Sequence, residues 1–473
     1  MSQERHPLSC FIGGSMRNDT IAAIATGLSD AGISIIRISG KNAFSIADAI
    51  FQPKKQGKII SQQKSHTIHY GYIVEKEQIL DEVLVSVMRA PHTYTAEDVM
   101  EINCHGGIIV TKKILQLILK HGARLAEPGE FTKRAFLNGR MDLSQAEAVM
   151  DLIHAKNERA VKNSVSQLRG SLLEKVSVLR EIILRDTAYI EAALDDPEHY
   201  DLEGFSDELS KHMQEVKKQL DSLIRSAEDG RMIKEGIRTA IIGKPNVGKS
   251  SLLNLFAGEE RAIVTEIAGT TRDTVEEMIK LRGICLHLID TAGIRETEDI
   301  VEKIGVEKAR KSAASADFIL YVVDTSSSLD EEEQELIELI KDKKTIVLLN
   351  KSDLEANITK EQLEQKTGKT VFSVSTKTGQ GMECLYDSIE ELFFKKEITF
   401  DDEIMITSER QKEALMLARA SIQKVEESIA LAMPEDFFSI DLMDAYTVLG
   451  TIIGEEVDED LINKIFKEFC MGK

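Results

Sequence analysis

The segment Gly243-Lys-Pro-Asn-Val-Gly-Lys-Ser250 constrains the fold of this 473-residue chain more than any other. It follows the strand-like apolar run 237–242 and precedes the helix-like run 251–257. A strand, a glycine-rich loop and a helix in this order form a phosphate-binding loop, because the glycines let backbone N–H groups surround phosphate oxygens. We expect Lys249 to reach the outer phosphates and Ser250 to bind Mg²⁺. The alternative is a plain glycine turn, and a chance match is expected in only about one or two of a hundred chains of this length.

Composition narrows the possible partners and the compartment. The chain has 59 basic and 80 acidic side chains, which gives a formal net charge of −21. A protein that binds nucleic acid alone and without sequence preference is expected to be basic, so any RNA contact should be local or shared with a partner. The five cysteines are scattered and form no C-x-x-C pair, which fits a reducing cytosol. No apolar run reaches the ~18 residues of a membrane span, and the first residues lack a hydrophobic signal region. We therefore expect a cytoplasmic protein without membrane contact.

The length predicts about three domains, of which the first is of the α+β class. Residues 1–18 are polar and aperiodic and are expected to be a flexible extension. Residues 19–138 show mixed strand and helix periods, with strands expected at 33–39, 67–74 and 82–88 and helices at 43–51 and 109–120. Within them, His105-Gly106-Gly107 is either a ligand-contacting turn or a purely structural one, and the structural turn is the commoner case.

We expect a helical domain in two parts, 139–235 and 396–473. Helical periodicity runs for about 50 residues from Leu143, returns at 209–227 and resumes from Ser408. It surrounds an α/β pattern at 236–395, so we predict one helical bundle with an inserted α/β domain. Its apolar stripes are typical of bundle core rather than of a cofactor site. The acidic run 330–333 is expected to be a solvated helix start that favours the helix dipole.

Three further motifs follow the phosphate loop in the order that a GTPase requires. Asp290-Thr-Ala-Gly293 closes an expected strand, where its Asp can hold Mg²⁺ through water and its Gly can meet the γ-phosphate. Asn350-Lys-Ser-Asp353 closes another, and the Asp353 carboxylate can accept two hydrogen bonds from guanine but not from adenine. Ser375-Thr-Lys377 can support the guanine oxygen through backbone N–H groups. Strand ends of an open parallel sheet form one ligand crevice, so these motifs predict a guanine-nucleotide site.

The residue that positions the attacking water is not evident from these motifs. Ras-like enzymes place a Gln directly after the Asp-x-x-Gly glycine, but this chain has Ile294 there. Because isoleucine cannot orient water, other groups must do so and must neutralise the charge that develops on the phosphate. The local candidates are Arg272, Arg295, Glu296, Glu298 and Glu302. Thr271 is the natural second hydroxyl ligand for Mg²⁺, on a loop that the γ-phosphate orders. A surface charge is the simpler interpretation of either arginine taken alone.

Segments outside the nucleotide motifs carry a family resemblance. They include Asp19–Thr26, Arg37-Ile-Ser-Gly40, Glu97–Glu101, His105–Gly107, Pro128–Phe131, Arg134–Asn138, Asp142–Glu147, Thr265–Asp273 and the terminal Cys470-Met-Gly-Lys473. Through them the chain resembles the MnmE (TrmE) family of tRNA-modification GTPases over almost its whole length. One departure is Gly27-Leu-Ser-Asp-Ala-Gly32, which stands where the family usually has a proline-containing run.

The resemblance implies a multidomain α/β plus α fold. Its parts are an N-terminal α+β folate-binding-like domain, a split helical-bundle domain and an inserted Ras-like P-loop GTPase domain. The N-terminal domain is then expected to bind a tetrahydrofolate derivative and to hold a constitutive homodimer. By position, the folate site comprises Arg37, Glu101, Arg140 and Lys473. Cys470 is either a thiol of the one-carbon chemistry or a packed residue.

The resemblance also implies that potassium-dependent pairing of two GTPase domains triggers hydrolysis. The implied potassium ligands are Asn246, Thr265, Ile267 and Thr270, and the implied magnesium ligands are Ser250 and Thr271. Glu302 matches the catalytic glutamate that positions water. The implied GTP-binding residues are Asn246, Val247, Gly248, Lys249, Ser250, Ser251, Thr265, Glu266, Ile267, Ala268, Gly269, Thr270, Thr271, Asp290, Thr291, Ala292, Gly293, Asn350, Lys351, Asp353, Ser375, Thr376 and Lys377.

The family acts with an FAD-dependent partner, MnmG (GidA), in a heterotetramer or larger complex. Together they add an aminomethyl or carboxymethylaminomethyl group to carbon 5 of the wobble uridine of tRNA, and the shared complex explains how an acidic chain can serve tRNA. Two alternatives are a regulatory GTPase of ribosome assembly and a dynamin-like membrane GTPase. The folate-like module and the Cys-Met-Gly-Lys terminus argue against the first. The lack of a basic or apolar membrane-facing segment argues against the second.

Overall fold

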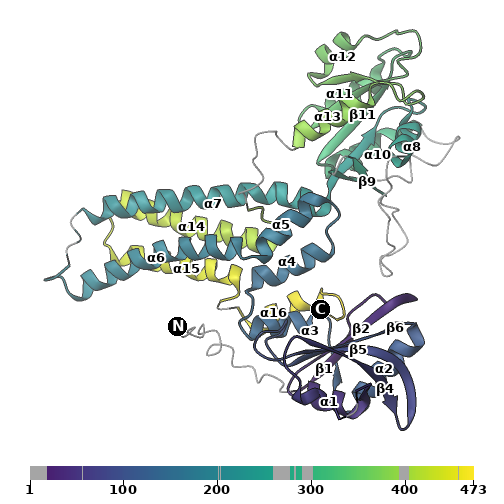
Figure 1. Cartoon of the computed structure of the whole chain (residues 1–473). Helices are drawn as coiled ribbons and strands as arrows, with labels where there is room; N and C mark the ends of the chain where they lie inside the picture. Colours follow the sequence, from purple (N-terminus) through teal and green to yellow (C-terminus); the bar gives the residue numbers. More distant parts are fainter. Residues whose placement is uncertain are drawn as a thin grey trace. The chain divides into compact units, whose positions relative to one another are not determined.

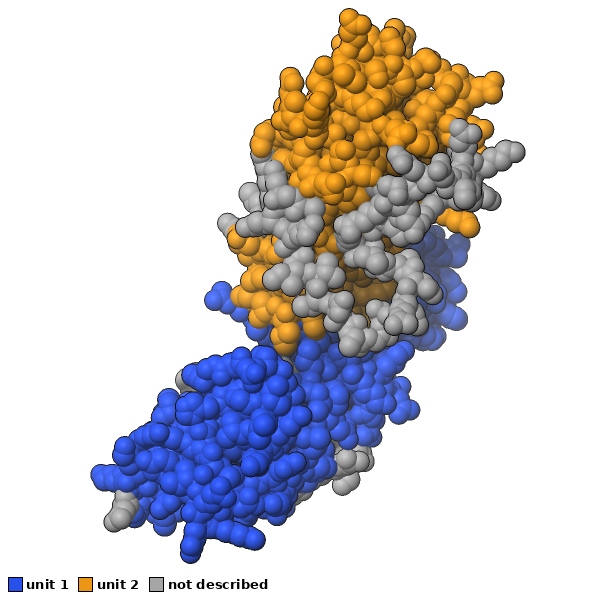
Figure 2. Space-filling view, turned by 90° about the vertical axis from the view of Figure 1, so that its right-hand side faces the viewer, with its two compact units in different colours: residues 1–150, 166–218, 413–473 blue, residues 151–165, 219–412 orange. Residues whose placement is uncertain are grey.

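A computed structural model describes residues 19–55, 57–200, 202, 204–258, 277–281, 284–289, 302–393, 404–455 and 457–472. The chain divides into two compact units, coloured separately in Figure 2. The first comprises residues 1–150, 166–218 and 413–473, and the second comprises 151–165 and 219–412. Among the described helices, none combines the length and the apolar character that crossing a membrane requires.

The first unit contains a seven-stranded sheet in the order β3-β4-β5-β6-β2-β1-β7 (Figure 1). All neighbours pair antiparallel except β1 and β7, which are parallel. The strands are β1 (Ile21–Ile24), β2 (Ala31–Ser39), β3 (Phe51–Pro53), β4 (Thr67–Glu75), β5 (Gln78–Met88), β6 (Val99–Gly106) and β7 (Arg124–Leu125). The helices of this domain are α1 (Ala43–Ile50), α2 (Ile108–Lys120), α3 (Glu130–Leu137) and the 3₁₀ turn η2 (Ile60–Gln62).

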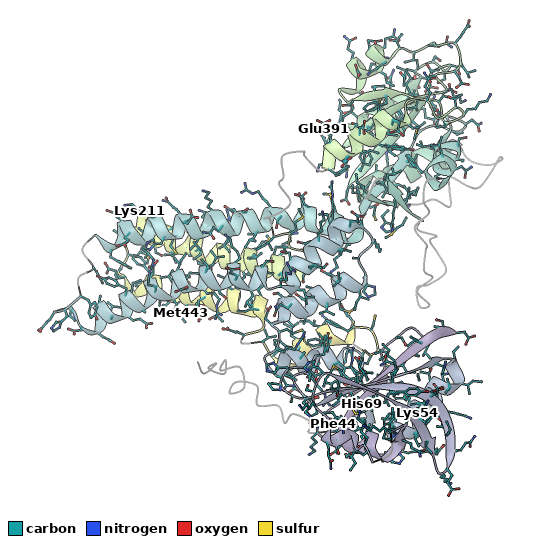
Figure 3. All side chains as sticks on the ribbon, in the orientation of Figure 1. Phe44, Lys54, His69, Lys211, Glu391 and Met443 are labelled. Atoms are coloured by element: carbon teal, nitrogen blue, oxygen red, sulfur yellow. The ribbon has the colours of Figure 1, made fainter. Side chains whose placement is uncertain are left out.

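Residue alternation gives this sheet one face covered by α1 and α2 and one face that is more open. On β4, His69 is buried on the covered side, whereas Tyr70 is exposed on the other (His69 is labelled in Figure 3). On β5, Val83, Val85 and Val87 are buried with α1 and α2 in one core, because alternate strand residues point to the same face. The same period predicts the strands from sequence, and the expected elements near 33–39, 43–51, 67–74, 82–88 and 109–120 are confirmed.

The His105-Gly106-Gly107 segment is a structural junction between β6 and α2. The His105 imidazole Nδ1 lies 2.6 Å from Asp81 Oδ1, and its backbone N–H donates to Asp81 Oδ2 at 2.8 Å. Gly106 is required by packing, since an added Cβ would lie 2.3 Å from the Ala31 carbonyl oxygen. Of the two interpretations of this segment, the contacts within the chain support the structural one.

The helical segments are α4 (Leu143–Ile153), α5 (Glu158–Leu168), α6 (Ser171–Asp195), α7 (Phe205–Glu235), α14 (Glu409–Ala430), α15 (Asp436–Ile453) and α16 (Glu459–Lys467). The helical pattern expected for about 50 residues from Leu143 is therefore three helices, and Gly170, with φ +94°, separates α5 from α6. In the first unit, α6 packs on α15, where the Arg180 guanidinium lies 4.0 Å from the Tyr446 ring centroid.

The second unit contains a six-stranded sheet in the order β13-β12-β11-β8-β10-β9, parallel except for β9. Its strands are β8 (Ile237–Ile242), β9 (Glu277–Leu281), β10 (Ile284–Leu288), β11 (Phe318–Asp324), β12 (Thr345–Asn350) and β13 (Val371–Ser373). Its helices are α8 (Lys249–Gly258), α10 (Glu302–Ser315), α11 (Glu331–Ile340), α12 (Lys360–Thr367) and α13 (Met382–Phe393). Separate cores cover the two sheet faces, as in a doubly wound α/β domain.

The core of this α/β sheet also includes residues from flanking helical segments. Ala160, Met232 and Met405 are buried in the same cluster as β8 and α8. The Asn163 side-chain amide donates to the Met405 carbonyl oxygen at 3.1 Å, which fixes the returning chain on α5. The predicted domain boundaries, 19–138, 139–235, 236–395 and 396–473, stay predictions.

Candidate nucleotide-binding and arginine-rich sites

The phosphate loop lies between β8 and α8, as the sequence predicts. Its glycines are required by both conformation and packing. Gly243 has φ +147°, and an added Cβ would lie 2.3 Å from the Val322 carbonyl oxygen. Gly248 has φ +105°, and its Cβ would lie 2.2 Å from Asn350 Nδ2. Asn246 adopts φ +63°, a conformation that Asn tolerates better than most residues. These conformations shape a concave backbone turn at a helix N-terminus, which is suited to an anion.

The Lys249 side chain lies over this loop. Its Nζ donates hydrogen bonds to the carbonyl oxygens of Gly243 and Lys244, both at 2.6 Å. Burial lowers the pKa of Lys249 to about 8, although Glu333 and Glu332 counteract this effect. A bound phosphate would restore the preference for the charged form, because an opposite charge nearby favours the ammonium group. Ser250 and Ser251 follow in the first turn of α8, where hydroxyl ligands of a nucleotide-bound cation are expected.

Asn350, at the end of β12, ties the base-recognition motifs to the phosphate loop. It is fully buried, and its Nδ2 donates to the Val247 carbonyl oxygen at 2.7 Å. Its Oδ1 accepts the backbone N–H of Thr376 at 3.0 Å. Three motifs therefore meet at one amide, although Val247 and Thr376 are 103 and 26 residues from Asn350 in sequence.

The Asp353 carboxylate is held in its ionised form. Ser375 Oγ donates to Asp353 Oδ1 at 2.8 Å, and this hydrogen bond lowers the pKa of Asp353. Lys351, with φ +61°, forms an ion pair of 2.5 Å with Asp324, which fixes the turn that presents Asp353. An ionised carboxylate accepts hydrogen bonds only, so this group suits the paired N–H donors of guanine.

Part of the predicted nucleotide site lies outside the described residues. This applies to Thr265, Glu266, Ile267, Ala268, Gly269, Thr270, Thr271, Asp290, Thr291, Ala292 and Gly293. The alternative candidates Arg272, Arg295, Glu296 and Glu298 lie outside as well, as does Ile294. Glu302 is the first residue of α10, but its side chain is not described. The roles assigned to these residues stay predictions.

In the first unit, the predicted folate-site residues meet on the more open sheet face. Arg37 on β2 and Glu101 on β6 are direct partners in register, and Arg37 Nε lies 2.8 Å from Glu101 Oε1. The Arg37 guanidinium lies 5.2 Å from the Tyr94 ring centroid, and the Arg140 guanidinium lies 4.9 Å from it. The structure thus brings together three of the four predicted residues, and Lys473 lies outside the described residues.

The C-terminal segment contributes to the same cluster. Arg37 Nη1 donates to the Gly472 carbonyl oxygen at 3.4 Å, across 435 residues of sequence. Gly472 has φ +86°, and an added Cβ would lie 2.3 Å from the Ile24 carbonyl oxygen. The Gly129 N–H donates to the Cys470 carbonyl oxygen at 3.3 Å. The chain end therefore returns to β1 of the N-terminal sheet.

Two aromatic residues of this cluster were missed by sequence reasoning. Phe131, whose ring centroid lies 5.6 Å from the Arg37 guanidinium, was noted only as part of a family segment. Tyr94 follows β5 in an irregular segment, and no periodic pattern singles it out. Two guanidinium groups, an aromatic surface and a carboxylate suit a ligand with a flat polar ring and anionic groups, as in a folate.

Comparisons with known proteins agree over most of the chain. The family description "MnmE helical domain" matches residues 143–470, and "GTP-binding protein TrmE N-terminus" matches residues 20–140. The tRNA modification GTPase MnmE of Lachnoclostridium phytofermentans is 63% identical over 458 residues, which cover 97% of this chain and 100% of the relative. That of Acetivibrio thermocellus is 49% identical over 97% of this chain and 100% of its own length. That of Lactobacillus johnsonii is 47% identical over 96% and 98%.

These matches join the N-terminal domain, the helical segments and the guanine-nucleotide motifs in one chain, as the sequence analysis predicted. The chain belongs to the MnmE family.

Proposed function

We propose that this protein is a GTP hydrolase that acts in the modification of tRNA. The observation that carries this proposal is the preformed guanine-nucleotide site. Asn350 joins the phosphate loop to the base-recognition segment, and Asp353 is held ionised by Ser375. The relatives named tRNA modification GTPase cover the chain almost completely, so the proposal concerns the whole protein rather than one domain.

We further propose that hydrolysis depends on magnesium and potassium ions. Ser250 and Thr271 would hold Mg²⁺, and Asn246, Thr265, Ile267 and Thr270 would hold K⁺. The side chains described, a hydroxyl at the start of α8 and an amide in the positive-φ turn, are oxygen donors that fit hard cations. The cations supply positive charge against the charge that develops on the phosphate oxygens. Glu302 would orient the attacking water, a role that Ile294 cannot fill.

For the one-carbon chemistry, we propose that a tetrahydrofolate derivative binds beside Arg37. The carboxylate of Glu101, which pairs with Arg37, would accept hydrogen bonds from an amino-substituted ring, and Arg140, beside Tyr94, would bind an anionic group. Gly472, whose carbonyl oxygen accepts from Arg37, belongs to the same cluster, and Lys473 follows it in the sequence. The product would be an aminomethyl or carboxymethylaminomethyl group on carbon 5 of the wobble uridine, made together with an FAD-dependent partner.

The more open face of the N-terminal sheet supports the proposal of a homodimer. Tyr70 and Leu84 are direct partners in register and are 39% and 45% exposed, and Ile68 beside them is 66% exposed. Exposed apolar side chains on neighbouring strands are typical of surfaces that another protein covers. A second copy of the chain is the occupant we propose. In sedimentation experiments the unmodified protein should then be a dimer, whereas Leu84→Asp should be a monomer.

The GTPase part of the proposal is tested by comparing hydrolysis in potassium and sodium salts. The rate should fall sharply when sodium replaces potassium at equal ionic strength. Glu302→Ala should hydrolyse GTP far more slowly while binding it with similar affinity. Equal rates in both salts would contradict the potassium assignment, and unchanged turnover in the variant would assign water orientation to another residue.

A further inference from the structure

The first turn of α11 lies beside the phosphate loop and is more than a solvated acidic helix end. Asp330 caps the helix by accepting the Glu333 N–H at 3.1 Å. Lys244 of the loop forms an ion pair with Asp330, and its Nζ lies 3.9 Å from Glu332 Oε2. The expectation of solvation is wrong for Glu333, whose side chain is completely buried.

The buried Glu333 carboxyl group has an incomplete set of hydrogen bonds. Tyr321 of β11, which is also fully buried, donates its hydroxyl to Glu333 Oε2. Glu333 Oε1 is buried and accepts no hydrogen bond from any residue that the structure describes. An ionised carboxylate with one oxygen that accepts no hydrogen bond costs more free energy to bury than a neutral carboxyl group does.

The strand pairing places this carboxyl group directly behind the start of the phosphate loop. Tyr321 pairs in register with Ile242, the last residue of β8. Gly243 follows, and it packs so closely on Val322 that an added Cβ would lie 2.3 Å from its carbonyl oxygen. Hence the loop begins at the end of β8, directly beside the strand β11 that carries the hydroxyl partner of Glu333.

The charged and titratable groups that influence Glu333 come from the phosphate loop, α8, β11 and α11 itself. The loop and the start of α8 contribute Lys244 and Lys249, which favour the ionised form. β11 contributes the Tyr321 hydroxyl. On α11 itself, Asp330 and Glu332 face Lys244, while the described Arg310 of α10 pairs with Glu335 instead, at 3.9 Å.

Burial is the larger influence, and it raises the pKa of Glu333 to about 7. Both protonation states are therefore populated near neutrality when the loop is empty. Nucleotide phosphates would place several negative charges beside Lys249, and a negative charge nearby disfavours a second one. A bound nucleotide should therefore favour the protonated carboxyl group.

We propose that Glu333 is a proton-linked positioning residue of the phosphate loop, whose carboxyl group takes up a proton from solvent when a guanine nucleotide occupies the loop. The only bond formed in this step is the O–H bond of the carboxyl group. The neutral group keeps its hydrogen bond to Tyr321 and stays buried behind the loop. The inference rests on the proposed function only in taking a guanine nucleotide as the ligand.

Proton counting by calorimetry tests this inference directly. GDP is titrated into the full-length protein at pH 7 in two buffers with different ionisation enthalpies. The unmodified protein should take up about half a proton more per nucleotide than Glu333→Gln, since a carboxyl group with pKa about 7 is half protonated beforehand. Only the nucleotide's own contribution cancels in this difference. Glu333 raises the pKa of Lys249, so its removal increases the proton uptake of Lys249 on binding and makes half a proton the upper bound of the difference. Glu335→Gln, an exposed carboxylate on the same helix, serves as the matched control and should behave like the unmodified protein.

The pH dependence of GDP affinity provides a second measurement. Relative to Glu333→Gln, the unmodified protein should lose affinity by about fivefold to tenfold between pH 6 and pH 8. Tyr321→Phe, which removes the donor to the ionised form, should move this loss to higher pH and so provides a test if Glu333→Gln does not fold. Equal proton uptake in the unmodified protein and Glu333→Gln, or the same midpoint pH in Tyr321→Phe, would overturn the inference. Failure of the unmodified protein to bind GDP would instead contradict the proposed function.

Discussion

The two candidate sites of this protein differ in how their residues are distributed along the chain. The nucleotide site is made of short motifs, each of which follows a parallel strand, so its parts are legible from local sequence. The arginine-rich site joins β2, β6, an irregular segment and the chain end, and Arg37 contacts a residue 435 positions away. Motif spacing therefore predicts the nucleotide site, where each motif follows a parallel strand. It does not predict the arginine-rich site, whose residues are brought together by antiparallel strand pairing.

The largest expected effect concerns base recognition at Asp353. Asp353→Asn replaces an acceptor by a group that also donates, so guanine loses its paired acceptor and affinity for GDP should fall by about a thousandfold or more. Xanthine carries an oxygen where guanine carries the amino group, so XDP should bind the variant better than GDP does. Titration of both nucleotides measures this switch.

Asp387→Asn, which changes a carboxylate of α13 outside the base-recognition motifs, is a suitable control and should retain GDP binding. If Asp353→Asn kept its preference for GDP over XDP, base recognition would have to be assigned to other residues. Asp353 would then no longer be an example of a functional residue that local sequence predicts.

The next expected effect is on stability, where the two regions should respond to pH in opposite ways. Burial raises the folded-state pKa of Glu333 from 4.5 to about 7, so this residue lowers the free energy of unfolding as pH rises through that window. Glu333→Gln should remove this loss and stabilise its unit by up to about 3 kcal/mol at pH 8, but not at pH 4.5. Thermal unfolding of the second unit at both pH values measures the difference.

Glu130 in the first unit provides the opposite case. Burial alone would raise the pKa of Glu130, but hydrogen bonds from Arg124 and Arg134 outweigh it and hold the pKa below 4.5. Its contribution is therefore complete above pH 4.5 and is lost as pH falls through the folded-state pKa. Glu130→Gln should weaken the first unit at pH 7 and much less at pH 3. A pH-independent loss would show that packing, rather than charge, is responsible.

A smaller effect is expected at the arginine-rich site. Arg37→Ala removes the guanidinium that links Tyr94, Glu101 and Gly472, and affinity for a tetrahydrofolate derivative should fall by about tenfold to a hundredfold. GDP affinity should stay unchanged. Lys54→Ala changes a cation elsewhere on the same sheet, where its Nζ lies 4.7 Å from the Tyr70 ring (Figure 3), and serves as the control. Loss of both ligands in Arg37→Ala would indicate misfolding instead.

The smallest effect is expected from deletion of Lys473. The deletion removes the lysine cation and moves the terminal carboxylate to Gly472, which lies against Ile24 and Arg37. Folate affinity should decrease by a few-fold, with GDP binding intact. An unchanged folate affinity would remove Lys473 from the site.

Much of the fold was predictable because local periods agree with tertiary packing. The strands around Ile73 and Val85 alternate, and both are buried on one face as their period predicts. The interruption between α5 and α6 at Gly170 could not be predicted from the sequence, because the apolar stripe continues across it. The burial of Glu333 was also missed, since a run of four acidic residues at a helix start is usually solvated and the hydroxyl of Tyr321 comes from strand β11 rather than from the helix itself.

We propose above all that this GTPase acts in the modification of the wobble uridine of tRNA. The most direct measurement is nucleoside analysis of tRNA from a strain that lacks the gene, compared with the same strain carrying the intact gene or the Asp353→Asn variant. We predict loss of the aminomethyl and carboxymethylaminomethyl groups at carbon 5 of uridine, restored by the intact gene only. An unchanged nucleoside profile in the strain without the gene would contradict the claim.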